Sequence, residues 1–496
     1  MAIRNSSNHS VDADPHDGDA ELSLAEIDEI IPDDDDPNAD HPMSDDDGDD
    51  EVVEEDAAAT MTTTAVEVEN DSKAYFDGHS SSIFSISAHP ATPSLFLTGG
   101  GDDVAYIWTT TTTPADADVV PRECKTVRRL DAHADSVVAT AFTAPDGAFA
   151  LTAGLDGAIH LYAAAAGWKL ADRVQEVDEV VWLAAHPHEP TVAVGCSDGS
   201  VWLYDVDSDG DGGGGGGGGG GGTGARADAK AKGRLAFRHA MRSHTASCTA
   251  GLFAHAGALL VTVAEDGSLY GWHTATGHAL LALTAADARF AIAGGLYSLA
   301  VSPSSAVAAV GGATGEIRVV GLPAPDSPPA AAAGEKRTSA RPKAGSSQAG
   351  QIVASMQAHS ESVESLSFHP NIPLLASASV DGTIALYDAA RGYAVRNTLH
   401  GHADAVVKAD FAAPGPAAAG WPLTSCGIDG SVRRWDARAG VQTACLRGHL
   451  GGNGAEGEGG VLGFVQTHDR IVTAGDDGVA LVFELAGGGG MPSETA

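Results

Sequence analysis

The sequence predicts an all-β fold, a propeller of eight four-stranded blades that follows an acidic N-terminal segment. Three observations carry this prediction. An Asp-Gly dipeptide recurs along the chain with an aromatic residue six positions after the Asp. In most units a Ser or Thr stands four positions before that Asp, and a His stands 22 to 28 positions before it. Because an Asp-Gly turn followed by an alternating run indicates a hairpin and a strand, each recurrence marks one repeated β unit.

The first part of the chain differs in composition from the repeats. The 496 residues carry 67 acidic and 28 basic groups, a net charge of −39. Residues 1–60 alone contain 22 Asp and Glu and one basic residue, Arg4. Such a segment cannot bury enough apolar surface to offset its chain entropy. We therefore expect a disordered tail at 1–72, a propeller at 73–486 and a disordered end at 487–496, with flexible inserts at 207–233, where a glycine run occurs, and at 322–350.

Composition also excludes several classes of protein. An acidic chain does not neutralise phosphates, so we expect no direct nucleic-acid partner and no membrane surface as partner. Five cysteines without a CxxC pair argue against a disulfide framework. Neither a signal pattern nor a long apolar span is seen in the sequence. We expect a soluble monomer in the cytoplasm, with the nucleus as an additional compartment left open.

The repeats are taken in order along the chain. Six have the full turn, at Asp156, Asp198, Asp266, Asp381, Asp429 and Asp477. An earlier unit at Asp102 has Asp in place of Gly, and a degenerate one at Thr314 lacks the His, the Asp and the aromatic. The third unit has Glu176 where the others have His. We predict eight blades, with seven as the alternative, at residues 79–108, 133–162, 176–204, 244–272, 285–320, 359–387, 402–435 and 449–483.

A ring of blades must also close. Ala74–Phe76, just before the first unit, can supply the outer strand of the last blade beside Val479–Phe483, which covers an edge that would otherwise be exposed. The two inserts follow a third strand, so we expect them on the face opposite the Asp-Gly turns, and Gly451–Gly460 on the same face as those turns.

These landmarks resemble the WD-repeat family, with Gly401-His402 and Trp435-Asp436 as the clearest copy. The resemblance implies that the His, Ser or Thr, Asp and Trp of a blade form one hydrogen-bonded network. The complete sets are His79, Thr98, Asp102 and Trp108; His244, Thr262, Asp266 and Trp272; and His402, Ser425, Asp429 and Trp435. A hydrolase would need one such constellation, whereas here it recurs six times, so we interpret it as architecture and predict no catalytic residue. We also predict no metal and no cofactor, because neither HExxH nor paired Cys/His spacing occurs.

A narrower resemblance covers residues 74–485. The acidic tail, Asp77-Gly-His79, Leu97–Trp108, the third unit without its His and Ile428–Arg438 are similar to the angio-associated migratory cell protein family. That resemblance implies, through fungal relatives, a chaperone of ribosome assembly that captures a basic large-subunit ribosomal protein on the face of the Asp-Gly turns. Candidate partner-binding residues there are Asp103, Asp135, Asp178, Glu179, Glu361 and Asp404. The alternative is a scaffold for signalling, cell migration or ubiquitin-ligase substrate recruitment, which the same fold supports.

Overall fold

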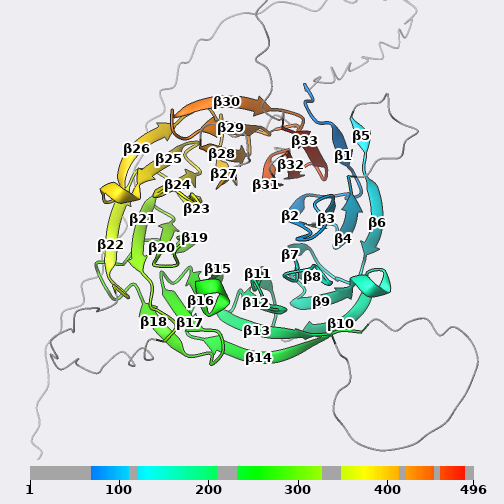
Figure 1. Ribbon diagram of the computed structural model, residues 1–496, viewed down its shortest axis with the longest axis horizontal. Coiled ribbons are helices and arrows are strands. Elements are labelled where there is room, and N and C mark those ends of the chain that lie inside the picture. Colours follow the sequence, from blue (N-terminus) through cyan, green and yellow to red (C-terminus); the bar gives the residue numbers. More distant parts are fainter. Residues whose placement is uncertain are drawn as a thin grey trace, which may run out of the picture. The chain divides into compact units, whose positions relative to one another are not determined.

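The computed structural model describes residues 69–110, 121–175, 177–208, 232–326, 348–412, 421–451, 459–467 and 469–485. These residues form eight sheets around a central opening, which confirms the predicted propeller and its eight blades (Figure 1). Residues 1–68 of the predicted tail, the middle of both predicted inserts, Glu176 and the predicted C-terminal end lie outside the described residues.

In seven blades, four strands follow one another in the chain from the central opening to the rim, and the eighth blade takes its outer strands from the start of the propeller. The first four blades consist of β2 Ile83–Ala88, β3 Leu95–Gly100, β4 Ala105–Thr109 and β6 Lys125–Leu130; β7 Val137–Phe142, β8 Phe149–Gly154, β9 Ala158–Ala163 and β10 Lys169–Gln175; β11 Val180–Ala185, β12 Thr191–Cys196, β13 Ser200–Asp207 and β14 Arg234–Arg242; and β15 Cys248–Ala254, β16 Leu259–Ala264, β17 Leu269–His273 and β18 Ala279–Leu283.

The other four blades complete the ring. They consist of β19 Leu296–Val301, β20 Val307–Gly312, β21 Glu316–Gly321 and β22 Ile352–Gln357; β23 Val363–Phe368, β24 Leu374–Ser379, β25 Ile384–Asp388 and β26 Ala394–Leu399; β27 Val406–Phe411, β28 Pro422–Gly427, β29 Val432–Asp436 and β30 Val441–Leu446; and β31 Val461–Gln466, β32 Arg470–Gly475 and β33 Ala480–Glu484 with β1 Ala74–Phe76 and the short β5 Arg122–Glu123.

The core lies between neighbouring blades. The second strands are buried almost throughout, as in β8 and β16, because a neighbouring blade covers each face of the sheet. The outermost strands are covered on one face only, so β22 alternates between half-buried and exposed residues. Continuous apolar runs therefore mark the interior of each blade, and alternating runs mark the rim.

The ring closes as predicted, through a strand from the start of the propeller. β1 pairs antiparallel with β33, with Ala74 opposite Val482 and Phe76 opposite Ala480. Phe76 is buried and its ring stacks on Trp108 of the first blade, with centroids 4.8 Å apart. Residues just before β1 also contact the ring, because Arg447 forms an ion pair with Glu69 and its backbone N–H donates to Asp71. Contacts with the propeller thus begin before the predicted boundary at 72.

Two faces of the ring can be defined by their connections. The upper face carries the connections from each outermost strand to the next innermost strand and the turns between second and third strands. The lower face carries the remaining connections. Among the described residues these contain both ends of the 207–233 and 322–350 inserts and three short 3-10 helices, η2 Ala164–Ala166, η3 His255–Gly257 and η4 Ala389–Arg391. Gly451, Gly459 and Gly460, the described residues of the predicted 451–460 segment, lie between β30 and β31 and so on the upper face, and 452–458 lie outside the described residues. No helix within the described ranges is long and apolar enough to cross a membrane.

Candidate upper-face interface

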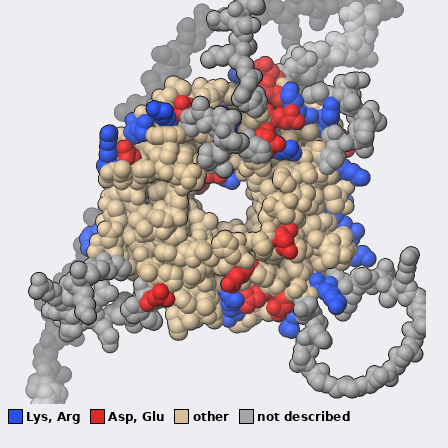
Figure 2. Space-filling view, viewed as in Figure 1, with Lys and Arg blue, Asp and Glu red and all other residues tan. Residues whose placement is uncertain are grey.

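The two faces of the propeller differ strongly in charge. In the described residues, the upper-face connections contain eighteen Asp and Glu but only two basic residues, Arg289 and Arg447. The lower-face connections contain four acidic and three basic residues over the same described ranges. The acidic residues of the connections are therefore concentrated on the upper face. Figure 2 shows one face of the ring, on which acidic and basic side chains are scattered or mixed around the opening.

All six candidate residues for partner binding lie on this upper face. Asp103 lies in the turn between β3 and β4, where it is half-buried and has a positive φ of 63°. The remaining five are exposed and precede innermost strands of four blades: Asp135, Asp178, Glu179, Glu361 and Asp404.

Two of these carboxylates are oriented by the backbone that follows them. Asp135 accepts a hydrogen bond from the Ser136 N–H at 2.7 Å, and Asp404 accepts one from the Ala405 N–H at the same distance. Both residues are exposed. A carboxylate fixed in this way is preorganised to accept a hydrogen bond from a Lys or Arg side chain.

Sequence reasoning missed further acidic residues of the same face. Asp77, Asp131 and Glu265 are exposed and Asp476 is half-buried, all in upper-face connections. A usable signal was present, because Glu265 and Asp476 immediately precede the turn aspartates of their blades. The position two residues after the His is too narrow a landmark, since residues of both kinds of connection reach this face.

The structural network of the seventh blade contains all four predicted side chains. His402 lies 3.1 Å from Asp429 through Nδ1 and 2.8 Å from Ser425 through Nε2, and the Trp435 indole N–H donates to Ser425 at 2.8 Å. An ionised Asp only accepts, so Nδ1 of a neutral His402 carries the proton and Nε2 accepts from the serine hydroxyl. Burial alone would raise the pKa of Asp429, but hydrogen bonds from His402, Ala403 and Ser431 lower it overall.

The network of the fourth blade contains an additional member. His244 lies 2.8 Å from Thr262, which accepts from the Trp272 N–H at 2.9 Å. Its other nitrogen lies 2.6 Å from Ser268, which in turn donates to Asp266, whereas His244 and Asp266 are 3.8 Å apart. The serine after the Asp-Gly turn therefore bridges the His and the Asp, which the sequence prediction did not include.

The first blade requires a correction. His79 lies 2.9 Å from both Asp102 and Thr98, but the buried Trp108 N–H has no hydrogen-bond partner among the described residues. Trp108 is instead stacked against Phe76 of the closing strand, in an apolar cluster. The predicted network of this blade thus ends at Thr98, because ring closure decides the position of the indole.

Three more blades repeat the His–hydroxyl–Asp arrangement, with the following sets: His133, Thr152 and Asp156; His359, Ser377 and Asp381; and His449, Thr473 and Asp477. The six Ser or Thr side chains that contact Nε2 of these histidines are fully buried, with their residues at 0% exposure. A nucleophile that solvent does not reach cannot attack a substrate, so these sets hold the upper-face turns in place. Within the described part of the chain, no group of three His, Cys, Asp or Glu is arranged to hold a metal ion.

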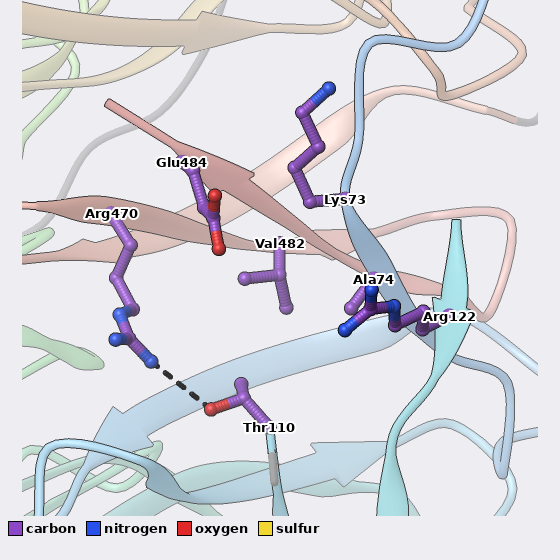
Figure 3. Close-up of a pocket in the computed structure, with 7 residues that line it drawn as sticks. All are labelled: Lys73, Ala74, Thr110, Arg122, Arg470, Val482 and Glu484. Carbon is purple, nitrogen blue, oxygen red and sulfur yellow. Dashed lines mark hydrogen bonds between the residues drawn. The ribbon is translucent and has the colours of Figure 1, made fainter. Parts of the chain in front are cut away.

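A cavity of about 470 Å³ lies at the seam where the ring closes. Lys73, Arg122, Arg470 and Glu484 are among its lining residues, and Arg470 donates to Thr110 at 3.1 Å (Figure 3). Arg470 and Glu484 lie at the lower ends of β32 and β33, and Thr110 directly follows β4 at its lower end, so this pocket is not part of the upper face. Its basic lining is also unsuited to a basic segment.

The fold and the repeated networks define a WD-repeat propeller, and known proteins agree. Residues 70–109, 124–162, 350–388 and 394–436 match the WD domain, G-beta repeat. A crystal structure of Sqt1 from Chaetomium thermophilum, bound to the N-terminus of the ribosomal protein L10, is 39% identical, with a TM-score of 0.68, and the match covers 84% of this chain and all of that one. The chain therefore belongs to the Sqt1 family of WD-repeat proteins.

Two other relatives agree with this assignment. The ribosome assembly protein SQT1 of Saccharomyces cerevisiae is 28% identical over 85% of this chain and 88% of its own length. The human angio-associated migratory cell protein is 26% identical over 84% of this chain and 81% of its own length. The resemblance predicted from the sequence is thereby confirmed.

Proposed function

We propose that this chain is a non-enzymatic chaperone of ribosome assembly that holds a basic segment of a large-subunit ribosomal protein against its upper face. The observation that carries the proposal is the charge of that face, with eighteen acidic residues against two basic ones in its described connections. The negative charge of such a surface steers a Lys- and Arg-rich segment toward it.

The relatives support the same role. Sqt1 of Chaetomium thermophilum has been crystallised with the N-terminus of ribosomal protein L10, so the corresponding segment is the first client to test. The client is a protein and not nucleic acid, because the phosphate backbone would meet the same negative charge. We further propose that the protein acts as a monomer in the cytoplasm, where a newly made ribosomal protein first needs a partner.

The test is a stopped-flow measurement of the rate at which the full chain associates with a labelled peptide of the L10 N-terminus. Exposed charges are screened over about 8 Å at physiological salt, so association should slow as salt rises. Asp178→Lys combined with Glu361→Lys should slow it further, since both side chains are exposed on the upper face.

A matched control exists on the lower face. Asp146→Lys with Asp326→Lys makes the same change of charge at two exposed lower-face residues and should leave association almost unchanged. Equal sensitivity to both pairs, or binding that ignores salt, would contradict the proposal and favour the scaffold alternative.

A further inference from the structure

Exposed apolar side chains also gather on the upper face. Among the described residues, six large exposed apolar side chains lie on outermost strands, at the rim. Of the others, Leu155, Val380 and Leu450 lie in upper-face connections, Phe84 and Tyr297 are the second residues of strands that begin at that face, and Leu252 lies further along β15. Apolar groups that share a face with many carboxylates are typical of an interaction site.

A repeated β-bulge places part of this apolar surface at the central opening. In all eight blades, the register between the innermost strand and its neighbour shifts at the second residue of the innermost strand. A bulge leaves that residue outside the ladder and redirects its side chain. We call these eight bulge residues the collar: Phe84, Val138, Val181, Thr249, Tyr297, Glu364, Val407 and Leu462.

The collar lies where the opening meets the upper face. The innermost strands surround the opening and begin at upper-face connections, so their second residues lie close to that face (Figure 1). The opening continues through the centre of the ring (Figure 2). Phe84 contacts the upper-face turn after β3, since a Cβ on Gly101 would be 3.1 Å from its ring. Phe84 is 44% and Tyr297 36% exposed, which is ample for a partner to cover.

We propose that the collar receives one apolar side chain of the client, an aromatic or branched aliphatic residue with Lys or Arg on both sides of it. This inference rests on the proposed function and adds a second determinant to it. Exposed charges mainly govern the rate of encounter and its salt dependence, whereas an apolar side chain removed from water lengthens the lifetime of the complex. Six of the eight collar residues are apolar, and acidic connections surround them.

Charge decides which occupant fits. A second copy of this chain would bring another upper face of the same sign and a net charge of −39, so it is repelled. An acidic or purely apolar segment would leave the surrounding carboxylates without counter-charge. A basic segment with one apolar residue satisfies both parts of the surface.

Two synthetic peptides test the inference. They have equal length and equal positive charge, and differ only at a central position that is Tyr in one and Ser in the other. Fluorescence anisotropy with the full chain at low salt should give about tenfold tighter binding of the Tyr peptide, as expected for one largely buried apolar side chain. Phe84→Ser with Tyr297→Ser should abolish that advantage and leave the affinity for the Ser peptide unchanged.

Phe237→Ser with Val395→Ser is the matched control, because these residues are 56% and 53% exposed on the outermost strands β14 and β26. This pair should keep the tenfold preference. Equal affinity of both peptides for the unmodified chain would overturn the collar proposal and leave the proposed function standing. If neither peptide binds, the upper face is not a site for basic segments and the proposed function itself fails. Comparison of the two peptides on the unmodified chain requires no variant to fold.

Discussion

Phe76→Ala tests whether one short strand holds the ring closed. Phe76 is 2% exposed, lies opposite Ala480 of β33 and stacks on Trp108 with parallel rings. It also contacts Tyr106 edge-on, with centroids 5.4 Å apart. Truncation removes a buried aromatic from the seam between the last blade and the first, and a Phe→Ala change in a core costs about 3–5 kcal/mol. We expect a loss of that size in the free energy of unfolding.

Urea denaturation followed by tryptophan fluorescence measures this loss, because Trp108 lies in the same cluster. Phe237→Ala provides the control, since an aromatic that is 56% exposed at the rim should change stability by less than about 0.5 kcal/mol. Hydrogen exchange in β1 and β33 should be faster in Phe76→Ala than in the unmodified chain, whereas exchange in β16, far around the ring, should change less. A loss below about 1 kcal/mol would refute the argument that burial of Phe76 stabilises the closure.

Three further predictions concern stability. A chain that begins at Glu69 should keep the thermal stability of the full chain, because the first described contacts of the propeller begin at Glu69 and Asp71; a large drop in Tm would contradict this. Asp429→Ala should lower the free energy of unfolding by about 1–3 kcal/mol and make the seventh blade easier to proteolyse, because Nδ1 of His402 loses its acceptor. Full stability in urea would count against a structural role of Asp429. Burial lowers the pKa of His160 to about 4, below an unfolded value near 6.5, so stability should fall as pH drops from about 6.5 to 4, by about 3 kcal/mol from this group. His160→Leu should remove that part of the acid sensitivity, as measured by urea denaturation at several pH values, and an unchanged pH profile would exclude His160 as its source.

The choice of leucine follows from the repeats. His160 is fully buried, and neither ring nitrogen has a hydrogen-bond partner among the described residues. It follows Asp156 by four positions, and Leu481 stands at the same position after Asp477. The substitution therefore introduces a side chain that the fold already accepts there, without removal of a hydrogen bond.

The repeated spacing in the sequence was sufficient to predict the blades. A turn at Asp429 and a Trp six residues later can be recognised without coordinates, because hairpin turns and strand periodicity are local properties of the chain. Even the degenerate fifth blade followed from its spacing, although it has Thr314 in place of the Asp. The closing strand Ala74–Phe76 was predictable for a related reason, since a ring with an open edge would be exposed.

The sequence by itself thus determined the order of the blades and the acidic character of the chain. It predicted eight blades with seven as the alternative, and its resemblance to WD repeats predicted the His–hydroxyl–Asp sets. Only the tertiary structure decided which side chains meet across blades. Trp108 of the first blade lacks its predicted hydrogen bond because Phe76, on the strand β1 that pairs with the last blade, stacks on it. Phe84 and Tyr297 came to one opening only because the same bulge recurs in blades that are far apart in the chain. Local patterns fix turns and strands, whereas contacts between distant segments depend on packing that no single repeat contains.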